Sequence, residues 1–215
     1  EALASYDANL FTVVAFRMLP QAVWGMPKYG TFNLHASLLP QYRGAAPINH
    51  AIINGETETG LTTFFLNEEI DKGAVIMREK VEIRPDETAG ELHDELMVLG
   101  NKVVVETLRK IETGDYQTQT QETLAAGKTL KDAPKIFKDF CQEKWDGDCQ
   151  SVYNHIRGLS PYPAAHTQIG NESGQTIDLK IYATKMEPCS PNVAIGIVLT
   201  ENKKYLKIAL RDSYL

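Results

Sequence analysis

The sequence predicts an α/β sheet domain followed by a small all-β domain. Over residues 1–114, short apolar segments alternate with helical patterns, which is typical of a sheet with helices packed against it. Residues 115–135 are polar, rich in Gln and Thr and without clear periodicity, which indicates a linker. Residues 136–215 contain short runs of alternating apolar and polar residues between Gly, Asn and Pro turns, which is typical of a small antiparallel barrel or sandwich.

The first predicted elements are a strand, a short helix and a second strand. Residues 10–16 form a nearly unbroken apolar run, the pattern of a strand covered on both faces, as in a parallel sheet. Pro20 suits the first turn of a short helix, and Pro27 ends that helix. Residues 31–35 predict the next strand.

A helix and two paired strands come next, followed by a long helix. Residues 47–53 predict a helix that ends at Asn54-Gly55, and residues 60–66 predict a strand that pairs with residues 75–83. Thr88 is a natural N-cap for the long helix, which extends to Gly114. Glu91 completes a capping box with Thr88. Apolar residues recur along this helix at helical spacing, at Leu92, Leu96, Leu99, Val103 and Leu108.

The all-β domain begins with a predicted helix over residues 151–159. Four alternating runs follow, at residues 165–169, 177–186, 193–200 and 205–210. The first domain has too few strands for a complete doubly wound sheet, and residues 214–215 lie inside a further predicted strand. We therefore expect the chain to be a fragment that lacks the N-terminal half of the first domain and the C-terminal end of the second.

The composition is that of a folded protein in a reducing compartment. The chain is 43% apolar and 23% charged, and it contains neither a membrane-length apolar run nor a signal-peptide pattern, so we expect a cytoplasmic location. Its net charge of −6 indicates no general affinity for nucleic acid. Cys141, Cys149 and Cys189 are odd in number and lack a CxxC pair, which argues against disulfides and a zinc site.

Asn33 and His35 are the first candidate site residues. They lie two apart at the C-terminal end of a predicted buried strand, so their side chains point to the same side. Ligands of open α/β sheets bind at this end of the strands, where an amide and an imidazole can converge on one substrate atom. The residues alone leave a second interpretation open, in which Asn33 bonds loop carbonyls and His35 is a buried histidine with a backbone partner.

Asp71 is the third candidate, in the turn after the predicted strand at residues 60–66. A carboxylate beside an imidazole fixes the imidazole's tautomer and raises its pKa, so Asp71 would make His35 a better proton carrier. Taken alone, Asp71 also fits an ordinary turn residue before Lys72-Gly73.

Two strings in the sequence resemble the 10-formyltetrahydrofolate-dependent formyltransferases: residues 33–48 (NLHASLLPQYRGAAPI) and residues 69–73 (EIDKG). Within that family, residues 42–47 (YRGAAP) are similar to the enzymes that act on methionyl-tRNA, more than to the purine-pathway glycinamide ribonucleotide formyltransferases. Residues 156–165 (IRGLSPYPAA) are similar to the start of the C-terminal domain of the former group. The resemblance covers essentially the whole chain. It implies a partial Rossmann-like formyltransferase domain followed by a small OB-like β-barrel.

The resemblance also implies a reaction and its catalytic residues. A formyl group would pass from 10-formyltetrahydrofolate to the α-amino group of methionine on initiator methionyl-tRNA, for translation initiation. Asn33, His35 and Asp71 match the family's catalytic residues: Asn33 and protonated His35 would bond the formyl oxygen, and Asp71 would favour the charged imidazole and accept a proton. Neither a metal nor a covalent nucleophile is implied, and we expect the full-length protein to be a monomer.

The residues expected to contact the folate donor lie in two loops, at Phe16 and Met18 and at Ser37, Leu38, Leu39 and Pro40. The resemblance makes Leu39-Pro40 a candidate cis peptide bond. The first loop departs from the family pattern, because Arg17 stands where Gly is usual and the loop is one residue shorter. Arg17 itself fits a solvated loop residue as well as a folate contact.

Several alternatives remain open. Ser37 lacks the Gly-x-Ser-x-Gly setting of a serine hydrolase, which argues against a nucleophilic role. Arg43 fits either pairing with acceptor phosphates or an ordinary surface role. His93 is expected to face solvent. The functional alternatives are another formyl acceptor or formyltetrahydrofolate hydrolysis within the same family, and a non-catalytic tRNA-binding fragment.

Overall fold

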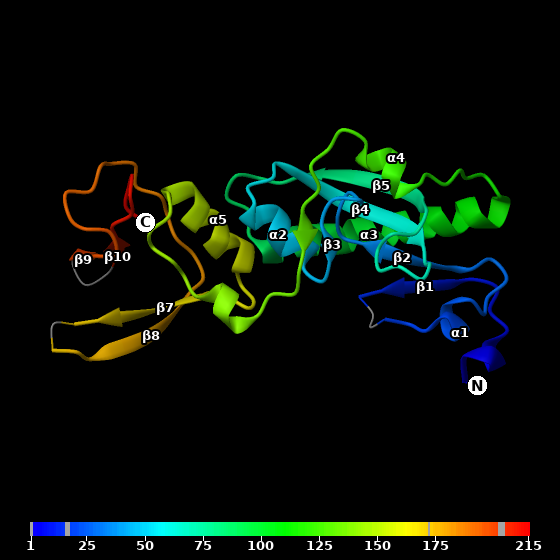
Figure 1. Ribbon diagram of the computed structural model, residues 1–215, viewed down its shortest axis with the longest axis horizontal. Helices are drawn as coiled ribbons and strands as arrows, with labels where there is room; N and C mark the ends of the chain where they lie inside the picture. Colours follow the sequence, from blue (N-terminus) through cyan, green and yellow to red (C-terminus); the bar gives the residue numbers. More distant parts are fainter. Residues whose placement is uncertain (1, 16–17, 172, 202–204) are drawn as a thin grey trace. The chain divides into compact units, whose positions relative to one another are not determined.

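The computed structural model describes residues 2–15, 18–171, 173–201 and 205–215 (Figure 1). The chain divides into two compact units. Unit 1 comprises residues 1–48, 58–83 and 93–135, and unit 2 comprises residues 49–57, 84–92 and 136–215. Each unit is therefore built from segments that are far apart in the sequence. The expected division into residues 1–114, 115–135 and 136–215 stays a prediction.

A mixed sheet of four strands lies at the centre of unit 1. Its order is β1 (Phe11–Val14), β2 (Thr31–His35), β4 (Glu58–Phe65) and β5 (Val75–Glu82). A 3-10 helix, η1 (Ala2–Tyr6), precedes β1. β1 and β2 are parallel and are connected through the short helix α1 (Gln21–Trp24), whereas the β2–β4 and β4–β5 pairs are antiparallel. These strands and α1 lie where the sequence predicts them.

β1 has a different environment from the one expected. The prediction that both faces of this strand are covered is wrong, because Thr12 and Val14 are exposed while Phe11 and Val13 are half-buried. β1 is an edge strand of the described sheet. An apolar run alone does not reveal whether a strand lies at the centre or the edge of its sheet.

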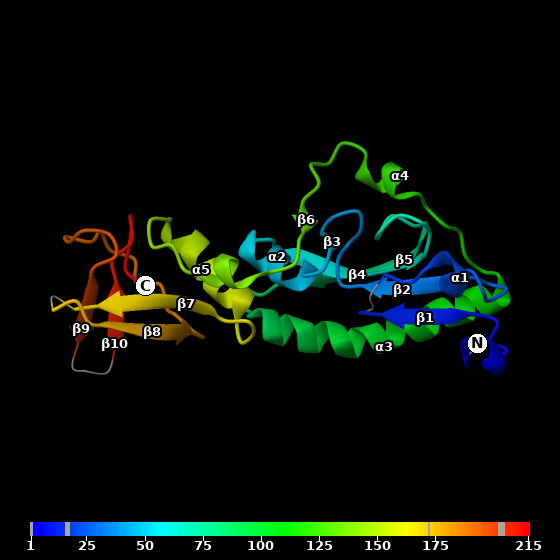
Figure 2. The same cartoon turned by 60° about the horizontal axis from the view of Figure 1, so that its bottom comes forward.

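The long helix α3 (Ala89–Thr113) runs along one face of the sheet (Figure 2). Its N-terminus carries the predicted capping box. The Thr88 N–H donates to Glu91 Oε2 at 2.9 Å, and the Glu91 N–H donates to Thr88 Oγ1 at 3.3 Å. These two bonds satisfy donors that the first helical turn otherwise leaves without partners.

The buried face of α3 differs from the predicted stripe at one position. Leu108 is 37% exposed, and Thr107 is buried in its place. Thr107 Oγ1 donates to the Val103 carbonyl at 2.8 Å and shares a 3.0 Å hydrogen bond with Thr63 Oγ1 of β4. A hydroxyl satisfied in this way is stable in a core, although an apolar pattern does not show it. The rest of the predicted stripe is buried or half-buried: Leu92, Leu96, Leu99 and Val103.

Short elements lie on the other side of the sheet. Figure 2 shows α4 (Gln121–Ala125) on the side opposite α3. The two-residue strand β3 (Arg43–Gly44) pairs in parallel with β6 (Asp132–Ala133), and helix α2 (Pro47–Ile53) follows β3. Leu124 of α4 packs against a cluster of Leu39, Phe64 and Val75. The segment 115–135 therefore contacts the sheet through α4 and reaches β3 through β6.

Unit 2 contains the 3-10 helix η2 (Lys138–Cys141), helix α5 (Cys149–Leu159) and two hairpins. Asp148 caps α5 by accepting the Ser151 N–H at 2.9 Å. The hairpins are β7 (Ala165–Gly170) with β8 (Thr176–Ile181) and β9 (Val198–Glu201) with β10 (Tyr205–Ile208). The core packs α5 against residues that include Ala165, Leu210 and Leu215.

The predicted OB-like barrel is not found, because among the described residues the two hairpins form separate two-stranded sheets. Sequence alternation and turn signals identify hairpins, but they do not specify how one hairpin pairs with another. The coarser prediction, an α/β unit followed by a C-terminal unit with β-hairpins, agrees with the structure. Within the described part of the chain, no helix combines the length and the apolar character needed to cross a membrane.

Candidate active site

Strand β2 has an apolar face toward α3 and a polar face away from it. Leu34 lies against α3, where a Cβ added at Gly100 would be 3.1 Å from its Cδ2 atom. Residues two apart in a strand project to one face, so Asn33 and His35 share the opposite face. Both are buried, with exposed fractions of 5% and 6%.

His35 is held by the loop that follows β2. Its Nε2 atom lies 2.8 Å from the Tyr42 carbonyl oxygen, and because a carbonyl only accepts, Nε2 is the donor. Its Nδ1 atom lies 3.9 Å from Asp71 Oδ2. The structure thus brings His35 and Asp71 together. The alternative interpretation of His35, a buried histidine with a backbone partner, describes Nε2 but leaves the approach of Asp71 unexplained.

Asp71 projects from the turn after β4 and is fixed at both its backbone and its carboxylate. Its φ of 54° lies in the left-handed region, which few residues other than glycine adopt. Oδ2 accepts a hydrogen bond from the Gly44 N–H at 3.1 Å. Gly44 has a φ of 126°, and a Cβ added there would lie 2.3 Å from the Ala133 carbonyl oxygen of β6. Only glycine fits at this position.

Burial lowers the pKa of His35 below its ordinary value of 6.5. The Asp71 carboxylate and the Tyr42 carbonyl raise the pKa, but desolvation is the largest cause and outweighs them. The expectation that Asp71 raises the pKa is correct for its own contribution and wrong for the net shift. His35 is therefore neutral at pH 7, with its proton on Nε2 and a free lone pair on Nδ1.

The amide of Asn33 contains an unsatisfied buried atom. Among the described residues, nothing hydrogen-bonds to Asn33 Oδ1. An unpaired buried acceptor costs about 1–3 kcal/mol, so such atoms concentrate where a ligand or water completes the site. A purely structural role, in which the amide nitrogen bonds loop carbonyls, does not account for this oxygen.

The loop at residues 37–40 is fixed by hydrogen bonds to Gln41 and to Thr62 of β4. Ser37 is fully buried, and its hydroxyl donates to the Gln41 carbonyl at 2.6 Å. Thr62 Oγ1 donates to the Ser37 carbonyl at 2.6 Å and accepts the Leu39 N–H at 3.1 Å. The Leu39-Pro40 bond is cis, as the resemblance suggested. The Ser37 hydroxyl therefore has a structural partner, a backbone carbonyl, where a serine nucleophile needs a base.

The remaining residues of the two loops expected to contact the folate donor have different environments. Leu38 is half-buried, whereas Leu39 and Pro40 are buried. Met18 is 75% exposed. Phe16 lies outside the described residues, as does Arg17. A donor-binding role for all of these residues stays a prediction.

Gln121 is a site residue that the sequence did not indicate. Its amide accepts two hydrogen bonds from Arg43 and donates two to the backbone of the Asp71 turn. The sequence predicts only a polar linker here, because no local pattern shows that one glutamine of this segment returns to the sheet. These bonds also give Arg43 a partner within the fold, and its pairing with acceptor phosphates stays a prediction.

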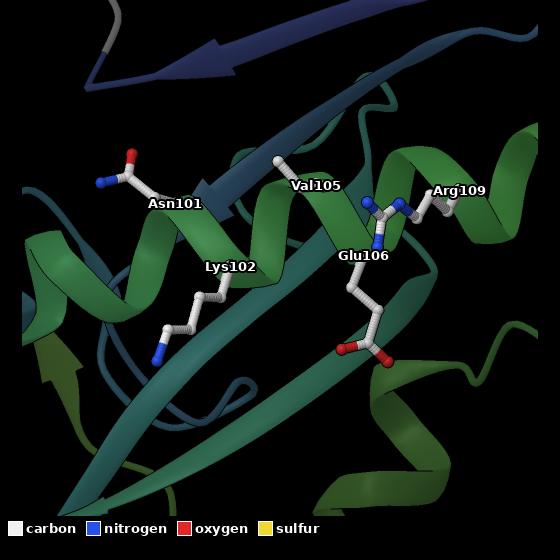
Figure 3. A pocket seen from close by; sticks show the side chains of 5 residues that line it. All are labelled: Asn101, Lys102, Val105, Glu106 and Arg109. Atoms are coloured by element: carbon white, nitrogen blue, oxygen red, sulfur yellow. The ribbon is translucent and has the colours of Figure 1, made fainter.

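Two hollows of unit 1 are lined by neither His35 nor Asp71. One of about 470 Å³ is lined by residues of α3 alone, Asn101, Lys102, Val105, Glu106 and Arg109 (Figure 3). Since α3 lies on the Leu34 face, this hollow is separate from His35. Another, of about 340 Å³, borders Leu38 and Arg78. The described residues contain no group of three His, Cys, Asp or Glu side chains placed to hold a metal.

Comparison with protein families gives two matches. The family described as formyl transferase matches residues 1–108, and the family described as the formyl transferase C-terminal domain matches residues 135–215. Curated relatives match along the same length. A methionyl-tRNA formyltransferase from Bacteroides thetaiotaomicron is 49% identical over 214 residues, and one from Flavobacterium psychrophilum is 51% identical over 214 residues. Each alignment covers 100% of this chain and 66% of the relative, so the chain spans about two thirds of their length.

Solved structures with a similar fold are more distant in sequence. HypX from Aquifex aeolicus, in complex with tetrahydrofolic acid, has a TM-score of 0.71 at 23% identity, covering 99% of this chain and 36% of its own. A 4-N formyltransferase from Francisella tularensis has a TM-score of 0.66 at 19% identity, covering 82% of this chain and 72% of its own. At these identities the likeness concerns the fold alone.

Proposed function

The chain belongs to the formyl transferase family, and on this premise we propose that the whole protein transfers a formyl group from 10-formyltetrahydrofolate to the α-amino group of methionine on initiator tRNA. The names of the relatives that are about half identical support this choice of acceptor. The observation that carries the chemistry is the His35–Asp71 pair, on the buried strand face that His35 shares with Asn33.

Asn33 is the proposed hydrogen-bond donor to the reacting carbonyl. The formyl donor supplies an electrophilic carbon and a nitrogen leaving group. Amine attack moves negative charge onto the formyl oxygen, and a fixed amide N–H directed at that oxygen stabilises the transition state more than the ground state. Loss of one such donor lowers turnover by about 10²–10³. Because Asn33 is buried, its amide acts where water does not screen it.

His35 and Asp71 are the proposed proton-transfer pair. The attacking amine must lose a proton, and the leaving nitrogen must gain one. His35 begins neutral because burial lowers its pKa, so Nδ1 is able to accept the proton. Asp71, 3.9 Å away, then stabilises the imidazolium, which returns the proton to the leaving nitrogen as its bond to the formyl carbon breaks. This differs from the role that the sequence suggested, in which His35 is protonated from the start.

The loop at residues 37–40 is the proposed wall of the folate site. Its Leu38 side chain is half-buried and borders the hollow of about 340 Å³, which makes it the part of this loop available to a ligand. Met18, which is exposed, is a proposed contact from the loop after β1. No metal takes part in the proposed reaction.

An acceptor comparison tests this function. The protein expressed from its whole gene is given labelled 10-formyltetrahydrofolate with methionyl initiator tRNA, with methionyl elongator tRNA, with an amino-sugar nucleotide, or with no acceptor. We expect labelled formylmethionine only with the initiator tRNA. Transfer to the sugar amine would assign another acceptor, and formate release without an acceptor would assign a hydrolase. Binding of tRNA without turnover under any condition would contradict an enzymatic role.

A further inference from the structure

Gln121, the first residue of α4, has no exposed surface although its side chain is polar. Its Oε1 atom accepts hydrogen bonds from Arg43 Nε at 2.9 Å and Arg43 Nη2 at 2.7 Å. Its Nε2 atom donates to the carbonyls of Asp71 at 2.8 Å and Gly73 at 3.0 Å. A guanidinium only donates and a carbonyl only accepts, so the orientation of the amide is fixed. All of its hydrogen-bonding capacity is used within the site.

The two carbonyls belong to the turn that carries the Asp71 side chain. This turn leaves β4 with Asp71 in the left-handed region. It passes so close to the sheet at Gly73 that an added Cβ would lie 1.6 Å from the Phe65 carbonyl oxygen. Backbone in a left-handed conformation at a non-glycine residue is held there by its surroundings. Gln121 supplies two of the bonds that hold it.

The guanidinium belongs to Arg43, whose two neighbours in the sequence hold the two reacting side chains. Arg43 lies between Tyr42, whose carbonyl accepts from His35 Nε2, and Gly44, whose N–H donates to Asp71 Oδ2. The Gln121 amide therefore links the turn that carries Asp71 to residues 42–44, which bond both His35 and Asp71.

We propose that Gln121 is a positioning residue, which holds the Asp71 carboxylate against His35 in the reaction proposed above. The proposal rests on that proposed function for its effect on turnover, but the geometry itself does not depend on the substrate. A neutral amide suits this role because it binds both partners without adding a charge that would compete for Asp71 or His35. The polar segment that the sequence suggests as a linker thus contributes a buried residue to the site.

Loss of Gln121 has a definite electrostatic consequence. Without the bonds to its backbone, the Asp71 turn is free to move, and the carboxylate no longer stays 3.9 Å from Nδ1. His35 stays buried but loses the influence that raises its pKa most. Its pKa then falls further, and the imidazolium formed during proton transfer is less stable.

Imidazole NMR titration of the whole protein tests the proposal, with the His35 signal assigned from its absence in His35→Gln. Gln121→Met keeps the length of the side chain and removes its hydrogen bonds. We expect it to lower the pKa of His35 by about one, toward the value in Asp71→Asn. In the double variant, Gln121→Met adds nothing to the effect of Asp71→Asn, because the carboxylate it positions is already gone. Gln121→Asn, which keeps the amide but is one methylene too short, serves as a second variant and shifts the pKa in the same direction.

Gln41→Met is the matched control. Gln41 also binds the 115–135 segment, donating to the Thr129 carbonyl at 2.7 Å and accepting the Lys131 N–H at 2.8 Å, but it has no bond to Asp71. Its substitution removes two hydrogen bonds to the backbone of this segment and leaves the pKa of His35 unchanged. In the transfer assay, Gln121→Met lowers kcat by about tenfold or more without changing KM for the formyl donor, because the effect falls on the transition state.

The outcomes separate the two proposals. An unchanged His35 pKa in both folded Gln121 variants overturns the positioning role, even if formyl transfer is observed. Equal pKa shifts in Gln121→Met and Gln41→Met also overturn it, because they would reflect general loosening. A specific pKa shift in a protein that transfers no formyl group supports the positioning geometry and contradicts the proposed function.

Discussion

His35 is subject to two opposing influences on its pKa, and only one of them is visible in the sequence. Strand periodicity places Asn33 and His35 on one face, but it was the family resemblance that paired Asp71 with His35, because the two residues lie on elements far apart in the sequence. Burial of the imidazole depends on loops that cover it, so the net direction of the shift emerges only in the fold. Gln121 was not predictable for a similar reason: its partners lie far away in the sequence.

The pH dependence of stability reports the lowered pKa of His35. In the unfolded chain His35 binds a proton below about pH 6.5, whereas in the folded protein it does so only at lower pH. Between these values the unfolded state holds more protons, so the free energy of unfolding decreases as pH falls. We expect denaturation midpoints of His35→Gln to fall less than those of the wild type between about pH 7.5 and about pH 5.5.

His93→Gln provides the control for this measurement, because His93 lies on the exposed side of α3. The same slope in wild type and His35→Gln would show that His35 titrates as it does in water.

Helix α3 shows which features of an element the sequence specifies. The capping box is local, and Thr88 and Glu91 form it as predicted. The placement of Thr107 in the core depends on a partner hydroxyl, that of Thr63, on another element. The β3–β6 pair was likewise not predictable, because two-residue strands far apart in the sequence carry no periodicity that identifies them.

Substitutions of Thr63 and Thr107 test the buried hydroxyl pair. Thr107→Val leaves the Thr63 hydroxyl without its partner in a buried position, so we expect the free energy of unfolding to fall by about 1–3 kcal/mol. The double variant Thr63→Val, Thr107→Val removes both hydroxyls and should recover part of that loss. Guanidinium denaturation measures the four proteins of the cycle. Losses that simply add would show that the two hydroxyls do not depend on each other.

Unit 2 draws on distant parts of the chain. Its three segments are joined by specific bonds, such as Asn49 Nδ2 to the Gly158 carbonyl at 2.7 Å and Arg157 Nη1 to the Glu87 carbonyl at 2.8 Å. The sequence predicts its helix and strands approximately, with β9 beginning at Val198 rather than at residue 193, but it does not indicate the contribution from residues 49–57 and 84–92. The two hairpins form separate sheets in place of the expected barrel. How hairpins pair with one another is also a long-range property, which turn signals do not specify.

Gly158→Ala tests the close packing of α5 on α2 within this unit. An added Cβ would lie 2.5 Å from Ile53 Cγ1 and 3.2 Å from the Asn49 carbonyl oxygen. Alanine favours a helix by about 1 kcal/mol over glycine, but the clash should outweigh this gain and destabilise the protein by about 1–3 kcal/mol. Thermal or guanidinium unfolding measures the change. A stabilised variant would mean that the two helices are not in close contact.

The single-turnover rate of formyl transfer by Asp71→Asn measures the contribution of the His35–Asp71 pair to the reaction. The enzyme is saturated with 10-formyltetrahydrofolate and methionyl initiator tRNA, and donor binding is measured separately by titration. Asn is close to Asp in size but has no charge to stabilise the imidazolium, so we expect the rate to fall by about 10² or more while donor affinity stays nearly unchanged. A rate within a few-fold of the wild type, or a loss confined to donor binding, would contradict the catalytic role of the pair.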